Sequence, residues 1–282
     1  MQAISKFNKT FTANKQILRS LSLSANNIQI EMDERTGFAT LSMNRPPVNL
    51  LNLEMFLLLT SSIKELEQNK CRGVILTSTS DSVFSAGLDI KEMYQPNVER
   101  LREFWTAFQD TWLAWYGTGL PTLALINGHS PAGGCVLSTC CEYRIMLPNF
   151  KIGLNEAQFG LVAPNFVRAS FRNVLTNRIA EMALYEGKMF QSAEALNIGL
   201  VDELANSKEE GHEKCIKFLQ TFSKVDPLTR SLTKQQFRGK DLDDLRRDKK
   251  RDMDDFVEFV TQSHIQMKLG SYLEKLKNKS QK

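Results

Sequence analysis

The stretch that decides the fold is TLALINGHSPAGGC, residues 122–135. Its first half, TLALING, is a short apolar run and predicts a buried strand over 122–128. Its second half contains the turn Pro131-Ala132-Gly133-Gly134, which predicts entry into a helix at about 133–140. A buried strand that turns directly into a helix is typical of crossover units with parallel strands.

The segments on either side continue this alternation of strands and helices. Helical spacing of apolar residues predicts helices over 52–68 and about 99–117, and helical patterns dominate from about residue 165. Strands are predicted at 28–33, 37–44, 72–79, 143–147, 150–157 and, after a turn, within 196–204. The chain therefore predicts an α/β core over 28–205 and a helical C-terminal region over 206–282, joined as one compact unit.

The charge of the chain is concentrated at its N-terminus. The 282 residues contain 36 Lys and Arg against 32 Asp and Glu, a formal charge of +4. Residues 1–30 hold Lys6, Lys9, Lys15 and Arg19 and no acid, so the rest of the chain is neutral. A basic, amphipathic, hydroxyl-rich and acid-free leader predicts a mitochondrial transit peptide over 1–27 and a mature protein in the matrix. The alternative is a tail that happens to lack acids.

Several function classes lose support from what the sequence lacks. It contains no GxxxxGK[ST] loop, no GxGxxG after a strand, and neither GxSxG nor HExxH. The five cysteines form no CxxC pair and the three histidines are widely spaced, so no metal site is expected. No stretch approaches 18 consecutive apolar residues, so we expect no membrane insertion.

Three segments combine a strand with a glycine turn or a carboxylate: FSAGLDIKEM at 84–93, NGHSPAGGC at 127–135 and KIGLNEAQFGLVAP at 151–164. The first two place small residues where a strand ends, and such turns expose backbone N–H groups. Two converging N–H groups would form an oxyanion hole for a carbonyl that gains negative charge. The third segment sets Glu156 among apolar residues, where a carboxylate is costly unless it is paired or functional.

Together these segments resemble the crotonase, or enoyl-CoA hydratase/isomerase, superfamily. The resemblance runs from about residue 28 to the C-terminus and is densest in RGVILTS, VFSAGLDIKEM, INGHSPAGGC, CEYRIM and IGLNEAQFGLVAP. Within the superfamily the chain is most similar to the Δ3,Δ2-enoyl-CoA isomerases. The resemblance implies a crotonase-like spiral of repeated ββα units with a helical C-terminal region that forms a homotrimer.

The resemblance also implies roles for individual residues. The backbone N–H groups of Ala86 and Gly133 would form the oxyanion hole, and Glu156 would be the catalytic acid and base. Contacts to the acyl-CoA substrate would come from Ala86, Gly87, Leu88, Asp89, Ile90, Gly133 and Asn155. No cofactor or metal is implied, because coenzyme A is part of the substrate.

Position 136 separates the two main activities of the superfamily. The hydratases of this family carry a glutamate directly after the Gly-Gly-Cys turn, and this chain has Val136 there. Valine cannot orient or deprotonate water, so we expect poor hydration and a 1,3-proton shift performed by Glu156 alone. Glu142, in the CEYR segment, is interpreted as structural.

The expected reaction is the conversion of cis- or trans-3-enoyl-CoA to trans-2-enoyl-CoA, in the β-oxidation of unsaturated fatty acids. Alternatives are another crotonase reaction (enoyl-CoA hydratase or dienoyl-CoA isomerase), an inactive acyl-CoA-binding relative, or an RNA-binding relative. The basic residues of 238–251 are interleaved with Asp, which favours a salt-bridged helix face and no nucleic-acid partner. The helices at about 241–278 would pack on a neighbouring subunit, although Phe256, Phe259, Val260 and Ile265 could equally cover the chain's own core.

Overall fold

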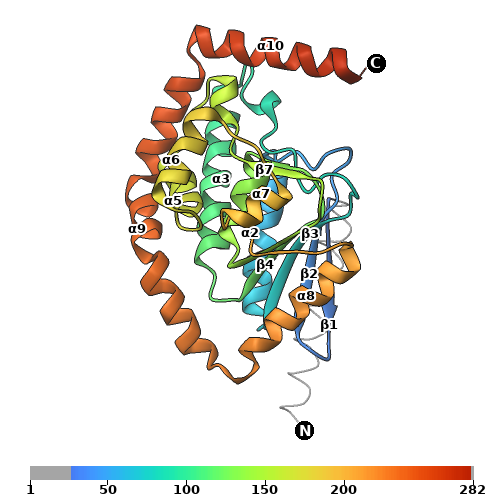
Figure 1. Cartoon of the computed structure of the whole chain (residues 1–282). Coiled ribbons are helices and arrows are strands. Elements are labelled where there is room, and N and C mark those ends of the chain that lie inside the picture. The colour runs from blue at the N-terminus through green and yellow to red at the C-terminus, as the bar shows by residue number, and fades with distance from the viewer. Residues whose placement is uncertain (1–26, 281–282) are drawn as a thin grey trace.

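The computed structural model describes residues 27–280, so the predicted transit peptide lies outside the described residues except for its last position. Figure 1 shows a twisted sheet on one side of a thick layer of helices. The strands are β1 (Ile28–Asp33), β2 (Phe38–Met43), β3 (Gly73–Ser78), β4 (Thr122–Ile126), β5 (Ser130–Pro131), β6 (Tyr143–Met146), β7 (Lys151–Gly153), β8 (Phe190–Gln191) and β9 (Glu203–Leu204).

The helices fill the intervals between strands and then dominate the C-terminal part. The α-helices are α2 (Leu53–Gln68), α3 (Val98–Gly117), α4 (Gly133–Cys140), α5 (Asn165–Arg172), α6 (Asn177–Glu186), α7 (Ser192–Asn197), α8 (Lys208–Gln220), α9 (Pro227–Val260) and α10 (Ser263–Ser280). Three 3₁₀ turns complete the set: η1 (Ile90–Glu92), η2 (Glu156–Phe159) and η3 (Thr221–Lys224).

The main sheet has the strand order β1-β2-β3-β4-β6-β9. β1 and β2, predicted as strands at 28–33 and 37–44, pair in antiparallel fashion, and every later pair in this sheet is parallel. The parallel pairing predicted from the alternation of strands and helices is therefore confirmed, and the α/β class with it. In a parallel sheet the carboxyl ends of neighbouring strands lie at one edge, so the loops that follow β3, β4 and β6 leave from the same side of the molecule.

The central strands are buried on both faces, which explains their continuous apolar sequences. On β3, Val74 and Leu76 belong to the large core beneath the helices, whereas Ile75 belongs to a second core. Leu123 and Leu125 of β4 also enter this second core, where they meet Cys215 and Leu219 of α8. Alternate residues of a strand face opposite sides, so α8 must cover one face of the sheet and the remaining helices the other.

A second, three-stranded sheet of order β5-β7-β8 corrects the predicted strand at 150–157. Only Lys151–Gly153 forms a strand, and Glu156 begins the 3₁₀ turn η2. The reason lies in the partner strand: β5 pairs Ser130 with Ile152 and Pro131 with Gly153, and then turns into α4. Without a longer partner the pairing ends at Gly153, and the chain is free to turn before Glu156.

The C-terminal helices cover the chain's own core. α9 runs along the outside of the helical layer and α10 crosses its end (Figure 1). Val260 and Ile265 are buried, and Phe256 and Phe259 pack against the same core, so the second of the two predicted alternatives describes these residues. Among the described helices, none combines the length and the apolar character needed to cross a membrane.

Candidate active site

Long-range backbone pairing brings the three chemistry-bearing segments together. The first segment joins the second because Phe84 N–H donates to the His129 carbonyl at 3.0 Å, next to a parallel bridge between Val83 and His129. The second joins the third because Ala132 N–H donates to the Gly153 carbonyl at 2.8 Å. These pairings place the turn at 84–93, the start of α4 and the turn that carries Glu156 next to one another.

The first two turns approach so closely that glycine is required between them. Gly87 has φ +88°, a conformation that residues with a Cβ rarely adopt. A methyl group on Gly87 would also lie 3.1 Å from the Gly133 nitrogen and 3.0 Å from the Ala132 Cβ. The two backbones thus lie in van der Waals contact, which places the N–H groups of both turns in the same region.

The predicted donor Ala86 needs correction. Its N–H donates to the Val48 carbonyl at 2.9 Å, so the structure does not leave this group free for a substrate. Two residues later, Leu88 forms a parallel bridge with Leu51 in which Leu51 N–H donates to the Gly87 carbonyl and Asp89 N–H to the Leu51 carbonyl, both at 2.9 Å. The bridge thus engages the Gly87 carbonyl and the Asp89 N–H. The Leu88 N–H between them has no acceptor among residues 27–280.

Gly133 supplies the second free donor because it begins α4. The first N–H groups of a helix have no partner within the helix, and the preceding residue, Ala132, has no side chain that could accept from them. Ala132 itself has φ +47° and ψ −119°, a strained conformation for alanine that directs the chain into the helix. The positive end of the helix dipole adds to the attraction for a developing negative charge.

Glu156 is half-buried, and one oxygen of its carboxyl group has no partner among the described residues. It is the first residue of η2, and its Oε2 is inaccessible to solvent and makes no hydrogen bond within the described chain. Burial raises the pKa of the Glu156 carboxyl to about 7, which outweighs a smaller lowering effect from its own backbone N–H. A carboxyl group with a pKa near neutrality can take up and release a proton at neutral pH, as a catalytic acid and base must.

A cavity of about 1120 Å³ opens beside Glu156, between η2, α5, α6 and α9. Its wall near Glu156 is formed by apolar or small residues, namely Leu154, Ala157, Leu161, Ala163, Phe166, Ala169, Ala180 and Leu184. Charged residues of α5, α6 and α9 form its outer rim. Of the predicted catalytic residues, Glu156 is the one that lines this space.

The remaining predicted residues take different positions. Asn155 precedes η2, and its buried Oδ1 also lacks a hydrogen-bond partner within residues 27–280. Asp89 is buried, and its carboxylate accepts from the Lys91 N–H at 3.2 Å and from Arg45 at 3.2 Å. An Asp89 side chain held in this way is occupied within the protein, so any contact of this residue with substrate would come from its backbone.

The surroundings of Val136 and Glu142 agree with the interpretation that neither residue acts as a second catalytic acid. Val136 is 2% exposed and sits in the apolar core on α4, so no carboxylate faces Glu156 from that position. Glu142 forms ion pairs with Arg230 and, at 3.4 Å, with Lys234, and accepts from the Thr122 N–H at 3.1 Å. The interpretation of Glu142 as a structural residue is confirmed.

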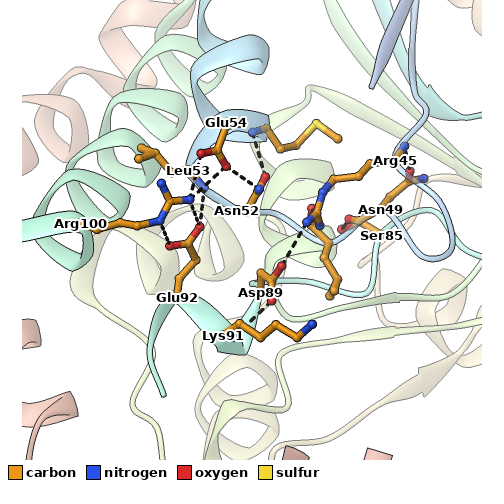
Figure 2. Close-up of polar contacts among 12 residues, drawn as sticks. Arg45, Asn49, Asn52, Leu53, Glu54, Ser85, Asp89, Lys91, Glu92 and Arg100 are labelled. Carbon is orange, nitrogen blue, oxygen red and sulfur yellow. Dashed lines mark hydrogen bonds and ion pairs between the residues drawn. The ribbon is translucent and has the colours of Figure 1, made fainter. Parts of the chain in front are cut away.

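Sequence reasoning missed the charged residues that hold the first turn in place. Arg45 and Arg100 lie outside the three segments, yet they bind Asp89 and Glu92 of the first segment (Figure 2). A signal was available, because Asp89 and Glu92 are acids in an otherwise apolar stretch, but their partners are distant in sequence. No group of three or more His, Cys, Asp or Glu is placed to hold a metal ion within the described part of the chain.

Comparison with known proteins agrees with this geometry. The family model described as Enoyl-CoA hydratase/isomerase matches residues 33–282. Enoyl-CoA delta isomerase 1, mitochondrial, from Rattus norvegicus is 40% identical over 255 residues, covering 89% of this chain and 88% of that protein. The Homo sapiens protein of the same name is 38% identical over 253 residues, covering 89% of this chain and 83% of its own length.

Solved structures give the same result. The crystal structure of human mitochondrial delta3-delta2-enoyl-CoA isomerase superposes with a TM-score of 0.87 at 37% identity, over 90% of this chain and 99% of that one. An enoyl-CoA hydratase from Bacillus halodurans superposes with a TM-score of 0.78 at 24% identity, over 87% and 99%, which shows the shared crotonase fold. With a family model matching residues 33–282 and relatives of up to 40% identity over most of its length, the chain belongs to the enoyl-CoA hydratase/isomerase family.

Proposed function

We propose that the protein is a Δ3,Δ2-enoyl-CoA isomerase, which converts cis- or trans-3-enoyl-CoA to trans-2-enoyl-CoA in the β-oxidation of unsaturated fatty acids. The observation that carries this proposal is the carboxyl of Glu156, whose Oε2 is shielded from solvent, has no partner among residues 27–280 and lies at the wall of a cavity, together with an apolar residue at position 136. The isomerase relatives and the superposition on the human isomerase support the same activity.

The reaction follows from the groups in the site. The thioester oxygen of the substrate accepts hydrogen bonds from the Leu88 and Gly133 N–H groups, the two free donors. Glu156, ionised, removes a proton from C2, and the electron pair delocalises over C2–C4 and the carbonyl as a dienolate whose oxyanion these donors stabilise. The same carboxyl then returns the proton to C4, which moves the double bond to C2–C3 and regenerates the ionised Glu156.

Hydration is disfavoured by the same geometry. Adding water across a double bond requires a group that holds and activates the water, and the family's hydratases are expected to use a second glutamate for this. Here the corresponding residue is Val136, packed into the core of the chain. Glu142 cannot replace it because its carboxylate is bound to Arg230 and Lys234.

The decisive experiment measures turnover of 3-enoyl-CoA by the wild-type protein and by Glu156→Gln. Glutamine keeps the shape of the side chain but cannot accept the C2 proton, so we expect isomerisation to fall by about 10²-fold or more while the fold and CoA affinity are retained. Glu258→Gln, an exposed change on α9, serves as the control and should leave turnover unchanged. Near-normal turnover of Glu156→Gln, or faster hydration of 2-enoyl-CoA than isomerisation by the wild type, would contradict the proposal.

The proposed location is the mitochondrial matrix. Two observations support it: the basic, acid-free sequence of residues 1–30, and the relatives whose names include the word mitochondrial.

The proposed assembly is a homotrimer. The expectation comes from the family resemblance, and it is supported by exposed apolar side chains early in α9: Leu228 is 67% exposed, Leu232 55% and Phe237 83%. We expect light scattering of the purified protein to give three times the chain mass, independent of concentration in the micromolar range. The mass of a single chain would contradict the assembly without affecting the assignment of the reaction.

Nucleic acid is not a proposed partner. Several basic residues of α9 are paired along their own helix, as predicted: Lys240 and Arg247 with Asp244, Arg246 with Asp243, and Lys250 with Asp254. Charges neutralised in this way offer no continuous positive surface to a phosphate backbone.

A further inference from the structure

The free donor at Leu88 lies in a segment with little regular structure. Between Ala86 and η1, the backbone is held to the rest of the protein by the bridge to Leu51. The direction of the Leu88 N–H therefore depends on how firmly the segment 87–92 is fixed against the segment 50–53. Figure 2 shows that charged side chains connect these two segments on both sides of the bridge.

On one side, Arg45 connects the segments through Asp89. Its Nη1 donates to the Leu50 carbonyl at 2.9 Å, and its Nη2 donates to the Asp89 carboxylate at 3.2 Å. Asp89 also caps η1 by accepting from the Lys91 N–H.

On the other side, Glu92 connects η1 with the N-termini of two helices. Its Oε1 accepts from the N–H of Leu53, the first residue of α2, at 3.3 Å. The guanidinium of Arg100, in the first turn of α3, donates to both oxygens, with Nε–Oε2 at 2.8 Å and Nη2–Oε1 at 2.7 Å. The side chain of Glu92 is only 7% exposed, whereas Arg100 reaches solvent.

We propose that Glu92 is a positioning residue of the isomerase: held by Arg100 and the start of α2, it fixes η1 and so directs the Leu88 N–H at the oxyanion of the substrate. This inference rests on the proposed function. Glu92 does not line the cavity beside Glu156, and it acts on the reaction through the backbone that it holds.

The chemistry of the contact favours positioning over simple stabilisation. A buried carboxylate loses its hydration, and an apolar side chain of similar size would often give the same stability or more. What a carboxylate adds is direction, because a bidentate contact with a guanidinium fixes both groups in one plane. Direction matters most for an oxyanion donor, since its contribution depends on lying at hydrogen-bonding distance from an oxygen whose charge develops during the reaction.

The chain supplies a matched control in Glu54. Its carboxylate also binds Arg100, with both oxygens within 3.1 Å of Nη2, but it is 51% exposed and does not contact the segment 87–92. Glu92→Gln and Glu54→Gln therefore each remove one charge next to the same arginine, and only the first loosens η1.

The test measures kcat and KM for a 3-enoyl-CoA in wild type, Glu92→Gln and Glu54→Gln. We expect kcat to fall about ten-fold or more in Glu92→Gln, with a smaller change in KM, because small displacements of a catalytic group cost large factors in rate. Glu54→Gln should stay within about two-fold of the wild type, as expected for an exposed ion pair. An equal kcat in the two variants overturns the inference, whereas a wild type that does not isomerise the substrate overturns the proposed function instead.

A second measurement separates positioning from general damage to the fold. Acetoacetyl-CoA can bind as an enolate, which absorbs in the near ultraviolet and shares its negative charge between the thioester oxygen and the C3 oxygen. Glu92→Gln should bind free CoA like the wild type but show less bound enolate, and the apparent pKa of the rate profile should not move. Unchanged enolate absorbance would contradict the inference. If Glu92→Gln does not fold, Arg100→Lys, which keeps the charge but loses the bidentate contact, must give the same loss of kcat and enolate for the inference to stand.

Discussion

At the scale of single residues, Glu156 combines two properties that usually exclude each other. It is ionisable, and it lies where ionisation is unfavourable, so burial raises the pKa of its carboxyl to about 7. An ordinary glutamate is a weak base at neutral pH, whereas a carboxyl with a pKa near 7 is a stronger one, as the proposed proton transfer requires.

The same property makes the stability of the fold depend on pH. The carboxyl has a pKa of about 7 in the folded state and 4.5 in an unperturbed glutamate, so the free energy of unfolding falls as the pH rises from about 4.5 to 7, and the full cost is present above pH 7. Glu156→Gln removes this cost. We expect urea unfolding to show that the variant is more stable than the wild type by at most about 3 kcal/mol above pH 7, with the difference fading to zero as the pH falls below 4.5.

The control for this measurement is Glu258→Gln, whose side chain is exposed and whose stability difference from the wild type should be flat with pH. A stability gain of Glu156→Gln that persists undiminished at pH 4 would show that the gain does not come from ionisation of this carboxyl.

Glu156 could be predicted from the sequence, and the oxyanion donor only in part. The carboxylate stands out because it interrupts an apolar, glycine-containing segment. The Ala86 N–H, which the resemblance implied as a donor, is already bonded to the Val48 carbonyl, and the local sequence does not indicate this partner because it lies 38 positions earlier in the chain. Every non-proline residue carries a backbone N–H, and which of these groups lacks an acceptor depends on the contacts of the folded chain.

At the scale of helices and strands, α9 closes the ends of two other helices. The last carbonyl groups of a helix lack intrahelical partners. Arg238 donates from Nη1 to the carbonyls of Tyr116 in α3, at 3.1 Å, and of Cys140 in α4, at 2.8 Å. Gln235 donates to the Gly117 carbonyl at 2.8 Å. The polar face at the start of α9 is thus a set of C-terminal caps for the helices beneath it.

This role predicts a stability effect. Arg238→Met keeps an unbranched apolar side chain but leaves two partly buried carbonyls without a donor and removes a cation–π contact with Tyr116 at 4.2 Å. We expect the free energy of unfolding to fall by about 1–3 kcal/mol, measured by urea denaturation. Arg246→Met is the control, since its pair with Asp243 is exposed and should contribute less than about 0.5 kcal/mol. Equal effects of the two changes would show that the caps contribute nothing.

Helices were easier to predict than their contacts. The spacing of apolar residues predicted a helix over about 99–117, and Phe104, Phe108, Trp112 and Trp115 on this helix are all buried. The short strand at 150–157 was overestimated because its length is set by β5, which ends at Pro131. The length of a strand depends on where its partner strand ends, and this cannot be predicted from the sequence of the first strand alone.

At the scale of the whole molecule, the site is made by topology. β5 and β7 are only two and three residues long, yet their pairing places the start of α4 beside the turn that carries Glu156. α10 then touches both halves of the site region from outside: Gln266 donates to the Met93 carbonyl at 2.9 Å, and Tyr272 packs on Phe159 with ring centroids 4.3 Å apart.

The α/β class and the parallel pairing followed from the alternation of elements along the chain. The strand order and the small second sheet did not, because they depend on which distant segments pair and not on local preference. The resemblance to a known family supplied what local patterns could not, namely that three unremarkable turns belong to one site.

The bridge between Leu51 and Leu88 affects which substitutions the protein can tolerate during evolution or protein engineering. Both proposed oxyanion donors are main-chain groups, so their chemistry is indifferent to the side chains attached to them. Position 88 can therefore be varied to reshape the space around a bound thioester without deleting a donor. Position 87 has no such latitude, because anything larger than hydrogen would push the two turns apart. Position 88 can therefore accept different side chains while keeping its proposed donor, whereas position 87 must remain glycine.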